Sequence, residues 1–569
     1  MLIFLTIDTS VLPLVDNKPR NVSKLPHLDM SKKTPRAASE LEKQMVAAAM
    51  ATKNGDVKST EVSEDAGASD EKRKAKPTIL VVTPEITYLP EGMGNMAQRL
   101  SAKAGGMADV SASLVSALYD QGADVHVALP NYRRMFNEGV KNIHDREYQR
   151  VRDNLGKDRI HLAEDRIFYH RDEVYAGENL RMALAFMREV INHIIPQVKP
   201  DLIHCNDWMT GLIPAVAKRN GIPSLITIHN IHTEKVSMAE VEDRGIDAAE
   251  FWNYLYFENP PYSYEQSREA NATDLLASGI FAADHVNAVS TTFLYEVVEG
   301  KHSFVPDAIR NELSNKLHAG CASGILNAPD VSYDPTTDPA LELNYDHANV
   351  MEGKAANKRK LQERCGLTID PDAPILFWPS RLDPMQKGCQ LLADILYQTV
   401  ADYTDIGLQV AIIANGSFQQ HFRNILDIHN LHGRVAVCDF DEEFSRLGYA
   451  GSDFMLMPSR FEPCGLPQMV SPKYGTLSVV HDTGGIHDTV EHMHHDCKMG
   501  NGFRFQHYSP QGLRWGVDEA IGFYRRPLEE REATLSRIMC ESAERFNHTT
   551  TAAAYISLYE KMLDQKVGA

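Results

Sequence analysis

Short apolar runs alternate along this chain with segments of helical spacing, and glycine or polar residues stand where the runs end. A strand, a helix and a second strand in this order form a βαβ unit, whose two strands pair in parallel. Repeated units of this kind restrict the chain to an α/β fold built on parallel sheets. Four units are predicted, each given as strand, helix and strand: 79–83, 107–121 and 123–129; 201–205, 209–220 and 224–228; 374–378, 387–400 and 408–414; 453–457, 465–474 and 476–480.

The units fall into two groups on either side of a middle region around residues 321–357. A chain of 569 residues is also too long for a single core, so two or more domains are expected. We therefore predict two Rossmann-like, doubly wound domains that face a deep cleft. In open parallel sheets a ligand binds beyond the carboxyl ends of the strands, and the motifs described below all lie at such ends.

The charge balance excludes several classes of partner. The chain has 58 Lys and Arg against 77 Asp and Glu, a net charge of −19. Such an acidic body repels nucleic acids and anionic membranes but does not oppose a neutral polysaccharide. No apolar stretch approaches the roughly 20 residues of a membrane-spanning helix, and residues 1–7 lack the features of a secretion signal.

The N-terminal segment 1–76 is rich in Lys, Ser, Ala and acidic residues and has almost no aromatic residues. It has too few apolar side chains to bury, so we predict a disordered extension. The eight cysteines are scattered, without a CxxC pair, which is typical of a reducing compartment. We expect a cytoplasmic protein.

Two glycine pairs stand at predicted helix starts, and both could bind an anion. One follows a lysine, in Lys103-Ala104-Gly105-Gly106, and the other is Thr483-Gly484-Gly485. Exposed backbone N–H groups and the helix dipole favour a phosphate at such places. The first motif taken alone also fits an ordinary tight turn.

A basic loop and an acidic loop follow two strands of the second group. Arg381 and Lys387 come between a buried strand and a helix, where they suit a diphosphate leaving group. Glu462 precedes a predicted helix that starts with Gly465, where a carboxylate and backbone donors could bind sugar hydroxyls. Alternatively, Arg381 and Lys387 are ordinary surface cations, and Glu462 is a carboxylate at a helix start that interacts with the helix dipole.

In the first group, Asp207 and His229 each follow a strand end. A histidine at such a place is more often structural than functional, but the other polar strand ends are expected to point into the same cleft. The cluster from His492 to Cys497 has residue types that bind transition metals. It lacks a second ligand pair elsewhere, so no metal site is predicted.

Taken together, these residues resemble the bacterial glycogen synthase and plant starch synthase family, glycosyltransferase family 5. The matching segments occur in family order over roughly residues 78–560, and the segment 458–466 with its downstream Thr-Gly-Gly is the most specific. The matching segments are 103–110, 204–212, 227–230, 324–327, 354–366, 380–388, 451–465 and 483–490.

The resemblance implies a GT-B fold with domains at 77–320 and 321–540 and a C-terminal helix, within 541–569, that crosses back to the first domain. It implies glucose transfer from ADP-glucose to an α-glucan, with retention of configuration and without a metal or other cofactor. By the same resemblance, Arg381 and Lys387 bind the diphosphate, and Lys103, Gly105 and Gly106 lie near the junction of phosphate and sugar. The implied contacts to the glucose or elsewhere in the substrate site are Asp207, His229, Glu462, Asn327, Tyr175, Cys464, Gly465, Thr483, Gly484 and Gly485.

The chain departs from the family pattern by substitutions at four places: Ala104 replaces a Thr, Met209 a His, His232-Thr233-Glu234 a Tyr-Gln-Gly, and Ala277 a Lys. It also has a loop insertion, 88–101, before Ala104. These changes concern the half of the cleft that handles the sugar and the acceptor. The alternatives are therefore a UDP-glucose donor, a small-sugar acceptor, or a catalytically weak glucan-binding homologue. The motifs show no obvious pair of carboxylates of the kind that a retaining hydrolase uses, which favours a front-face transfer. The sequence does not determine the oligomeric state.

Overall fold

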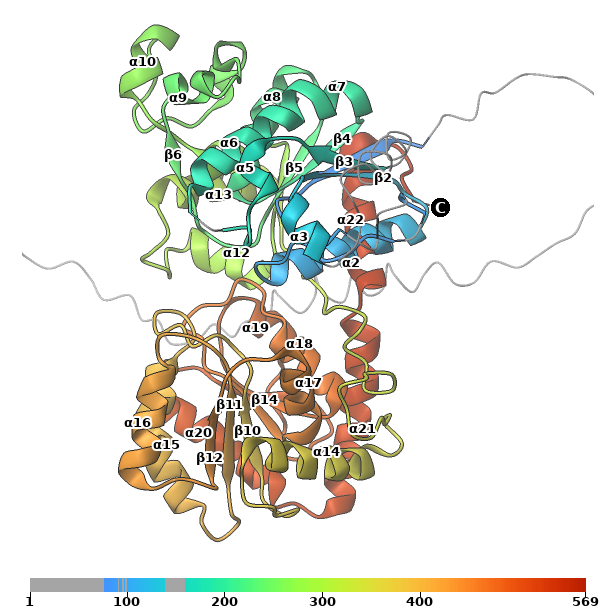
Figure 1. Ribbon diagram of the computed structural model, residues 1–569, viewed down its shortest axis with the longest axis vertical. Coiled ribbons are helices and arrows are strands. Elements are labelled where there is room, and N and C mark those ends of the chain that lie inside the picture. Colours follow the sequence, from blue (N-terminus) through green and yellow to red (C-terminus); the bar gives the residue numbers. More distant parts are fainter. Residues whose placement is uncertain are drawn as a thin grey trace, which may run out of the picture. The chain divides into compact units, whose positions relative to one another are not determined.

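The computed structural model describes residues 76–90, 92–94, 97, 100–138, 159–175 and 177–568. The predicted disordered extension, 1–76, lies outside these residues except for its last position. The described residues form two parallel-sheet α/β domains (Figure 1). The fold class predicted from the sequence is therefore confirmed.

The first domain contains a seven-stranded sheet in the order β3-β2-β1-β4-β5-β8-β9, in which every pair is parallel. Its central strands are buried on both faces because helices cover them, which explains their continuous apolar runs. The chain reverses its direction of progress between β1 and β4, the place where doubly wound sheets bind ligands. The strands are β1 (Thr78–Val82), β2 (Asp124–Pro130), β3 (Ile160–Ala163), β4 (Leu202–Asn206), β5 (Ser224–Ile228), β8 (His285–Ala288) and β9 (Ala322–Ser323).

The second domain repeats this topology in a six-stranded sheet of order β12-β11-β10-β13-β14-β15, again parallel throughout. Its reversal lies between β10 and β13, the two strands that precede the basic loop and the acidic loop. The strands are β10 (Ile375–Trp378), β11 (Gln409–Ile413), β12 (Val435–Cys438), β13 (Phe454–Met457), β14 (Leu477–His481) and β15 (Gly502–Phe505).

Helices flank both sheets. In the second domain, Figure 1 shows α15, α16 and α20 on one side of the sheet and α17, α18 and α21 on the other. The helices of the first domain are α2 (Gly106–Asp120), α3 (Arg133–Glu138), α5 (Arg166–Tyr169), α6 (Asn179–Glu189), α7 (Ile195–Val198), α8 (Ile213–Arg219), α9 (Met238–Asp243), α10 (Tyr264–Ala270), α11 (Leu275–Ala282), α12 (Thr291–Val298) and α13 (Asp307–His318). Those that follow are α14 (Val350–Cys365), α15 (Cys389–Asp402), α16 (Gln419–His429), α17 (Glu442–Gly451), α18 (Pro467–Val470), α19 (Gly484–Thr489), α20 (Pro510–Tyr524), α21 (Leu528–Arg545) and α22 (His548–Leu563).

Two predicted helices are interrupted in the structure. The segment 209–220 is divided into a 3₁₀ turn, Trp208–Thr210, and α8, and Gly211 between them packs closely on α11, where a side chain would lie 2.1 Å from the carbonyl oxygen of Leu275. The segment 465–474 begins only at Pro467, since Gly465 has a φ of +75°, and its second half is a 3₁₀ helix, Ser471–Tyr474. Gly465 therefore belongs to the acidic loop rather than to the helix.

The C-terminal helices connect the two domains. Leu535, Ile538 and Met539 of α21 lie in the core of the second domain, whereas Tyr555 and Tyr559 of α22 lie in the core of the first. The chain thus crosses back between α21 and α22, which confirms the predicted crossover helix. At the other connection, β9 pairs with β8 of the first sheet, so this sheet extends three residues beyond the boundary expected at residue 320.

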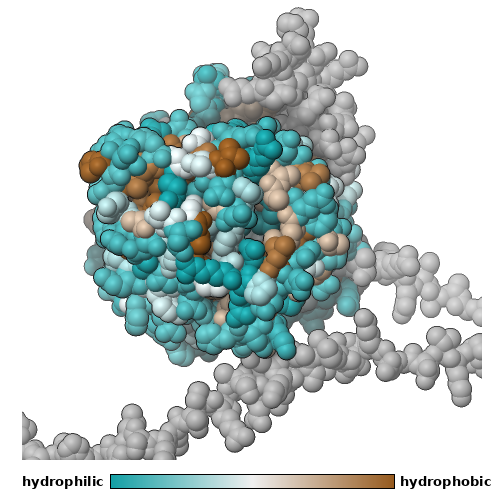
Figure 2. Space-filling model, turned by 90° about the horizontal axis from the view of Figure 1, so that it is seen from below, coloured by the Kyte–Doolittle hydropathy of each residue, from teal (hydrophilic) through white to brown (hydrophobic). Residues whose placement is uncertain are grey.

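Within the described ranges, no helix is long and apolar enough to cross a membrane. Figure 2 shows one face of the molecule, on which hydrophilic residues predominate and hydrophobic ones form small, separate patches. All eight cysteines are free thiols.

Candidate functional site

The basic loop and the acidic loop of the second domain are held together by backbone contacts. The N–H of Arg460 donates to the carbonyl oxygen of Gln386 at 2.7 Å. Gly388 has a φ of +75°, and a side chain there would lie 2.1 Å from the carbonyl oxygen of Pro458. The loop that follows β10 therefore packs directly against the loop that follows β13.

This packing forms an ion pair between two predicted site residues. The Nζ of Lys387 lies 2.7 Å from Oε2 of Glu462, and the two side chains are only 12% and 8% exposed. Arg381, in contrast, is exposed, and no side chain of the described residues pairs with its guanidinium. The loops thus present one buried, compensated cation and one cation that is free to meet an anion.

The second glycine pair fixes the acidic loop and does not leave its amides open. The N–H of Gly485 donates to the carbonyl oxygen of Glu462 at 2.9 Å, and the N–H of Gly484 donates to Oε2 of Glu296 at 3.0 Å. A side chain at Gly484 would lie 2.1 Å from the carbonyl oxygen of Glu462. In this structure protein oxygens accept both amide hydrogen bonds, and a phosphate contact at Gly484 and Gly485 stays a prediction.

Glu296 comes from α12 of the first domain and was not predicted as a site residue. Its carboxylate also accepts hydrogen bonds from Thr483 Oγ1 at 3.2 Å and His302 Nε2 at 2.9 Å. Burial acts to raise the pKa of Glu296, but these bonds outweigh it and hold the pKa below its usual value. A second bond from α12 accompanies it, in which Thr292 N donates to Asp488 Oδ2 at 3.0 Å.

The first glycine pair likewise has an internal acceptor. The N–H groups of Ala104 and Gly105 donate to Oε2 of Glu85 at 2.7 and 3.1 Å, and Lys103 forms an ion pair with Asp109 at 2.9 Å. A carboxylate of the protein thus accepts the N–H of Gly105 in this structure, and the expected position of Gly105 near the phosphate stays a prediction.

Gly106 and Asn327 connect the first domain with the acidic loop. A side chain at Gly106 would lie 3.4 Å from Leu466, and the backbone N–H of Asn327 donates to the thiol of Cys464. The side chain of Asn327 is 7% exposed, and its Oδ1 has no hydrogen-bond partner. A buried acceptor without a partner can accept a hydrogen bond from a ligand hydroxyl at this position.

Asp207 and His229 lie together at the carboxyl ends of β4 and β5. Asp207 has a φ of +55°, an uncommon conformation for a residue other than glycine, and its Oδ1 accepts the N–H of His229 at 2.7 Å. The His229 Nε2 lies 2.9 Å from Oδ1 of Asn206. Burial lowers the pKa of His229 to about 4, so its imidazole is neutral near pH 7.

The structure adds Glu85 to this group, a residue that the motifs had not indicated. Burial raises the pKa of Glu85 and that of Asp207 to about 7. The carboxylate of Glu85 adds to the rise at Asp207, and both carboxylates raise the pKa of Tyr175. The hydroxyl of Tyr175 hydrogen-bonds Glu85, and its own pKa is raised chiefly by burial. The motif search found no carboxylate pair, but the structure places Glu85 and Asp207 close enough to interact. Glu85 follows β1 by three residues, so a systematic search of polar residues after strands would have found it.

Two of the four departures from the family pattern lie in the core. Met209 and Ala277 are completely buried, so neither side chain can contact a substrate. His232 packs edge-on against Trp208 with ring centroids 5.4 Å apart. Of the four substituted places, only Ala104 and 232–234 have side chains that solvent reaches.

His492 of the His492–Cys497 cluster is held by packing and hydrogen bonding within the protein. His492 stacks on Trp515 with ring centroids 5.4 Å apart, and its Nδ1 accepts the N–H of Arg504. Over the part of the chain that the structure describes, no group of three or more His, Cys, Asp or Glu side chains is arranged to hold a metal ion.

The buried Glu85 carboxyl predicts a pH-dependent stability. Because its pKa in the folded protein is about 7, the folded state keeps a proton that the unfolded chain releases near pH 4.5. The stability gained from this proton is complete below pH 4.5 and is lost as the pH rises through 7. Glu85→Gln should therefore flatten the fall in unfolding free energy between pH 5 and 8, by roughly 2–4 kcal/mol.

Urea titrations of both proteins across this pH range measure the effect. The matched control is Glu299→Gln, which changes an exposed glutamate of the same domain and should leave the pH profile of the wild type unchanged. Parallel profiles for wild type and Glu85→Gln would show that Glu85 is ionised in the folded protein at pH 5.

Comparisons with known proteins found similar sequences over most of the chain. Residues 78–310 match a family model described as the starch synthase catalytic domain, and residues 373–518 match one described as glycosyl transferases group 1. The glycogen synthase of Syntrophotalea carbinolica is 32% identical over 497 residues, covering 81% of this chain and 96% of that protein. The glycogen synthase of Thermotoga maritima is 31% identical over 509 residues, with coverages of 82% and 97%.

One solved structure extends the likeness to the fold. The catalytic domain of starch synthase IV from Arabidopsis thaliana, bound to ADP and acarbose, superposes with a TM-score of 0.69 at 24% identity. The match covers 86% of this chain and 100% of that one.

Proposed function

Because this chain belongs to the glycogen and starch synthase family of glycosyltransferases, we propose that it transfers glucose from ADP-glucose to the non-reducing end of an α-1,4-glucan, with retention of configuration. The observation that carries the proposal is the pairing of the basic loop with the acidic loop at the reversal point of the second sheet. The ADP in the starch synthase IV structure supports an adenine nucleotide as the donor.

In this proposal, the basic loop binds the diphosphate. Arg381 supplies an unpaired guanidinium, whose planar fork suits phosphate oxygens. Lys387 is already compensated by Glu462 at 2.7 Å, so a bound diphosphate would share its charge with that carboxylate. As the bond between the sugar and the diphosphate breaks, both cations stabilise the negative charge that develops on the leaving oxygen.

The sugar lies between Glu462, Asn327 and the polar group of the first domain. The orphaned Oδ1 of Asn327 accepts one of its hydroxyls, and neutral His229 contacts another. The acceptor hydroxyl attacks the anomeric carbon from the face that the diphosphate leaves, and its proton passes to the leaving diphosphate oxygen. The protein then contributes positioning and electrostatic support rather than a nucleophile.

The carboxylates of the first domain favour this front-face path over a covalent intermediate. Glu85 accepts two backbone N–H groups and Asp207 accepts those of His229 and Asn230. Both have pKa values raised to about 7, so each is partly protonated near neutral pH. In this proposal both carboxylates hold the backbone N–H groups of the loops beside the sugar, and neither acts as the nucleophile.

The test is the release of nucleoside diphosphate from a donor, with and without glycogen. We expect ADP release from ADP-glucose that depends on glycogen, persists in EDTA because Arg381 and Lys387 supply the countercharge, and is at least tenfold slower with UDP-glucose. Product analysis by NMR should show α-1,4 linkages. Faster turnover with UDP-glucose would refute the donor, a requirement for Mg²⁺ or Mn²⁺ would refute the phosphate assignment, and glycogen binding without release from either donor would indicate a non-catalytic homologue.

A further inference from the structure

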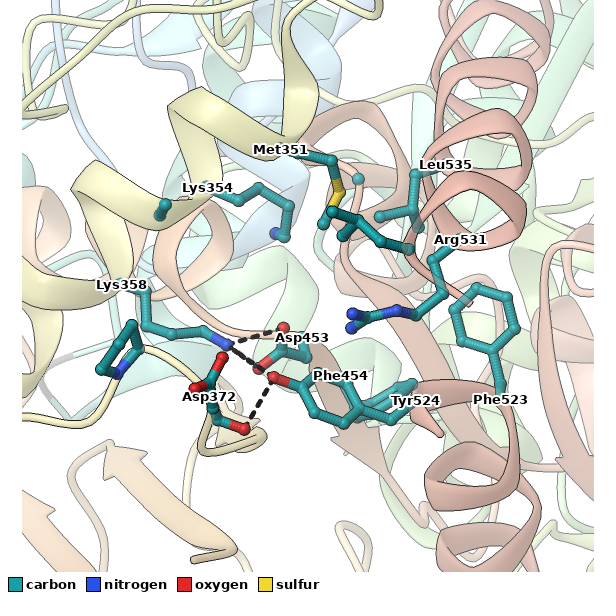
Figure 3. Close-up of a pocket in the computed structure, with 14 residues that line it drawn as sticks. Met351, Lys354, Lys358, Asp372, Asp453, Phe454, Phe523, Tyr524, Arg531 and Leu535 are labelled. Carbon is teal, nitrogen blue, oxygen red and sulfur yellow. Dashed lines mark hydrogen bonds and ion pairs between the residues drawn. The ribbon is translucent and has the colours of Figure 1, made fainter. Parts of the chain in front are cut away.

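A separate pocket of about 290 Å³ lies in the second domain, between α14, α20 and α21 (Figure 3). Asp372 precedes β10 and Asp453 precedes β13, so the pocket opens at the amino ends of these strands. Arg381 and Glu462 follow the carboxyl ends of the same two strands. Because the strands are parallel, the pocket and the proposed catalytic loops lie at opposite edges of the sheet.

Two of the three cations that line the pocket are fully engaged by the protein. The Nζ of Lys354 donates to the carbonyl oxygens of Ala450 and Tyr474 and to Oγ1 of Thr476, at 2.8–3.2 Å. An ammonium group has three protons, so none of them remains for a ligand. Burial lowers the pKa of Lys354 to about 7, which further limits its use as a fixed charge.

Lys358 is engaged in the same way. Its Nζ contacts the carbonyl oxygen of Ala373 at 3.1 Å, the carboxylate of Asp453 at 2.8 Å and the hydroxyl of Tyr524 at 3.3 Å. Asp453 therefore neutralises Lys358 and is not available to the third cation of the pocket.

That third cation, Arg531 of α21, has no anionic partner among the residues that the structure describes. Its Nε is buried without a hydrogen-bond partner, and its guanidinium lies 4.6 Å from the ring centroid of Tyr524. Figure 3 shows the side chain extending from α21 toward the centre of the pocket. Two other arginines do have carboxylate partners: Arg526, in the connection between α20 and α21, pairs with Glu530, and Arg537 of α21 pairs with Glu541.

The remaining wall carries one exposed carboxylate, that of Asp372, and is otherwise largely apolar. Met351, Phe454, Phe523 and Leu535 line it, and Ala355 stands at its exposed side. A ligand for this pocket therefore needs one anionic group and an apolar body with few hydroxyls, because almost every polar proton of the lining is already used.

We propose that this pocket binds a small organic anion, whose phosphate or carboxylate group meets the guanidinium of Arg531 and whose apolar body packs against Met351, Phe454 and Leu535. The planar fork of Arg531 accommodates either head group. Such a ligand would supply the charge that the guanidinium lacks and would connect α21 with α14. This site is independent of the proposed transfer reaction and takes no part in it.

Calorimetric titration of the full chain with phenyl phosphate tests the site, with benzoate as the carboxylate arm and inorganic phosphate as the arm without an apolar body. We expect saturable 1:1 binding of phenyl phosphate, benzoate or both, and binding of inorganic phosphate that is at least tenfold weaker. The better of the two organic probes identifies the preferred head group.

Two variants locate the binding. Arg531→Gln removes the charge and should weaken binding of the better organic probe at least tenfold. Ala355→Phe should weaken it to a similar degree by filling the exposed side of the pocket while leaving the charge in place. Arg525→Gln, the matched control, changes an exposed arginine that pairs with Asp405 and should bind like the wild type.

Three outcomes would overturn the proposal. One is the absence of saturable binding of either organic probe to the wild type. Another is unchanged affinity in both Arg531→Gln and Ala355→Phe. The third is loss of binding in Arg381→Ala with full binding in Arg531→Gln, which would place the anion at the basic loop instead.

Discussion

Lys387→Ala is expected to lower kcat by about 10²–10³-fold while the protein remains folded. The lysine is 12% exposed and lies in a loop that a diphosphate would approach, and a charge-assisted contact of this kind contributes about 1.5–3 kcal/mol. If the contact strengthens as the diphosphate leaves, the loss appears in kcat. If it serves only ground-state binding, KM for the donor rises and kcat is unchanged. Steady-state kinetics with ADP-glucose separates the two results.

The affinity for ADP distinguishes the roles of the two loops. We expect weaker ADP binding in Lys387→Ala and in Arg381→Ala. In Glu462→Ala, ADP should bind about as well as in the wild type, because this change leaves Lys387 uncompensated and free for a phosphate, while glucose transfer falls. The reverse pattern would contradict the assignment of the basic loop to phosphate and of Glu462 to sugar.

Tyr555→Ala should destabilise the first domain by about 3–5 kcal/mol. The side chain is 1% exposed in a core to which α22 contributes, and its hydroxyl accepts a hydrogen bond from Nδ2 of Asn287 at 2.8 Å. Its removal creates a cavity and leaves a buried amide donor without an acceptor. The free energy of unfolding from urea titrations measures the loss.

Tyr295→Ala is the matched control, because this tyrosine of α12 is 47% exposed and its loss should change the unfolding free energy by less than about 1 kcal/mol. Tyr555→Phe, which removes the hydroxyl alone, should fall between the two. A Tyr555→Ala protein as stable as the control would show that α22 does not complete the first core.

The sequence predicted the central strands of both sheets, because parallel strands buried on both faces are continuous apolar runs. It also predicted the basic loop and the acidic loop, since each directly follows such a strand. It did not predict β3, β8, β9, β12 and β15, which lie at or near the sheet edges. The contacts of the glycine pairs could not be predicted in this way. The acceptor for Gly484 comes from Glu296, 188 residues away in the middle of a helix, and nothing in the local pattern marks a helical glutamate as the partner of a distant amide.

The departures from the family pattern show the same limit. Met209 was expected to affect acceptor binding because it follows Asp207-Trp208, but the 3₁₀ turn there directs it into the core. The direction of a single side chain after a strand end therefore decides whether it contacts a ligand or packs in the core. Here the turn packs on α11 through the close approach of Gly211 to Leu275, a contact that exists only in the folded chain.

The return of α22 to the first domain has a consequence for synthesis on the ribosome. Strand β9 completes the first sheet at Ser323, but the tyrosines that close its core are made on the order of 200 residues later. At a synthesis rate of about 5–20 residues per second, the first domain waits for roughly 10–50 seconds with the surface that receives α22 uncovered. His204, Thr227 and Asn287, the partners of those tyrosines, lie on that surface. Polar groups at these positions would make it a poorer surface for aggregation until the last helix arrives.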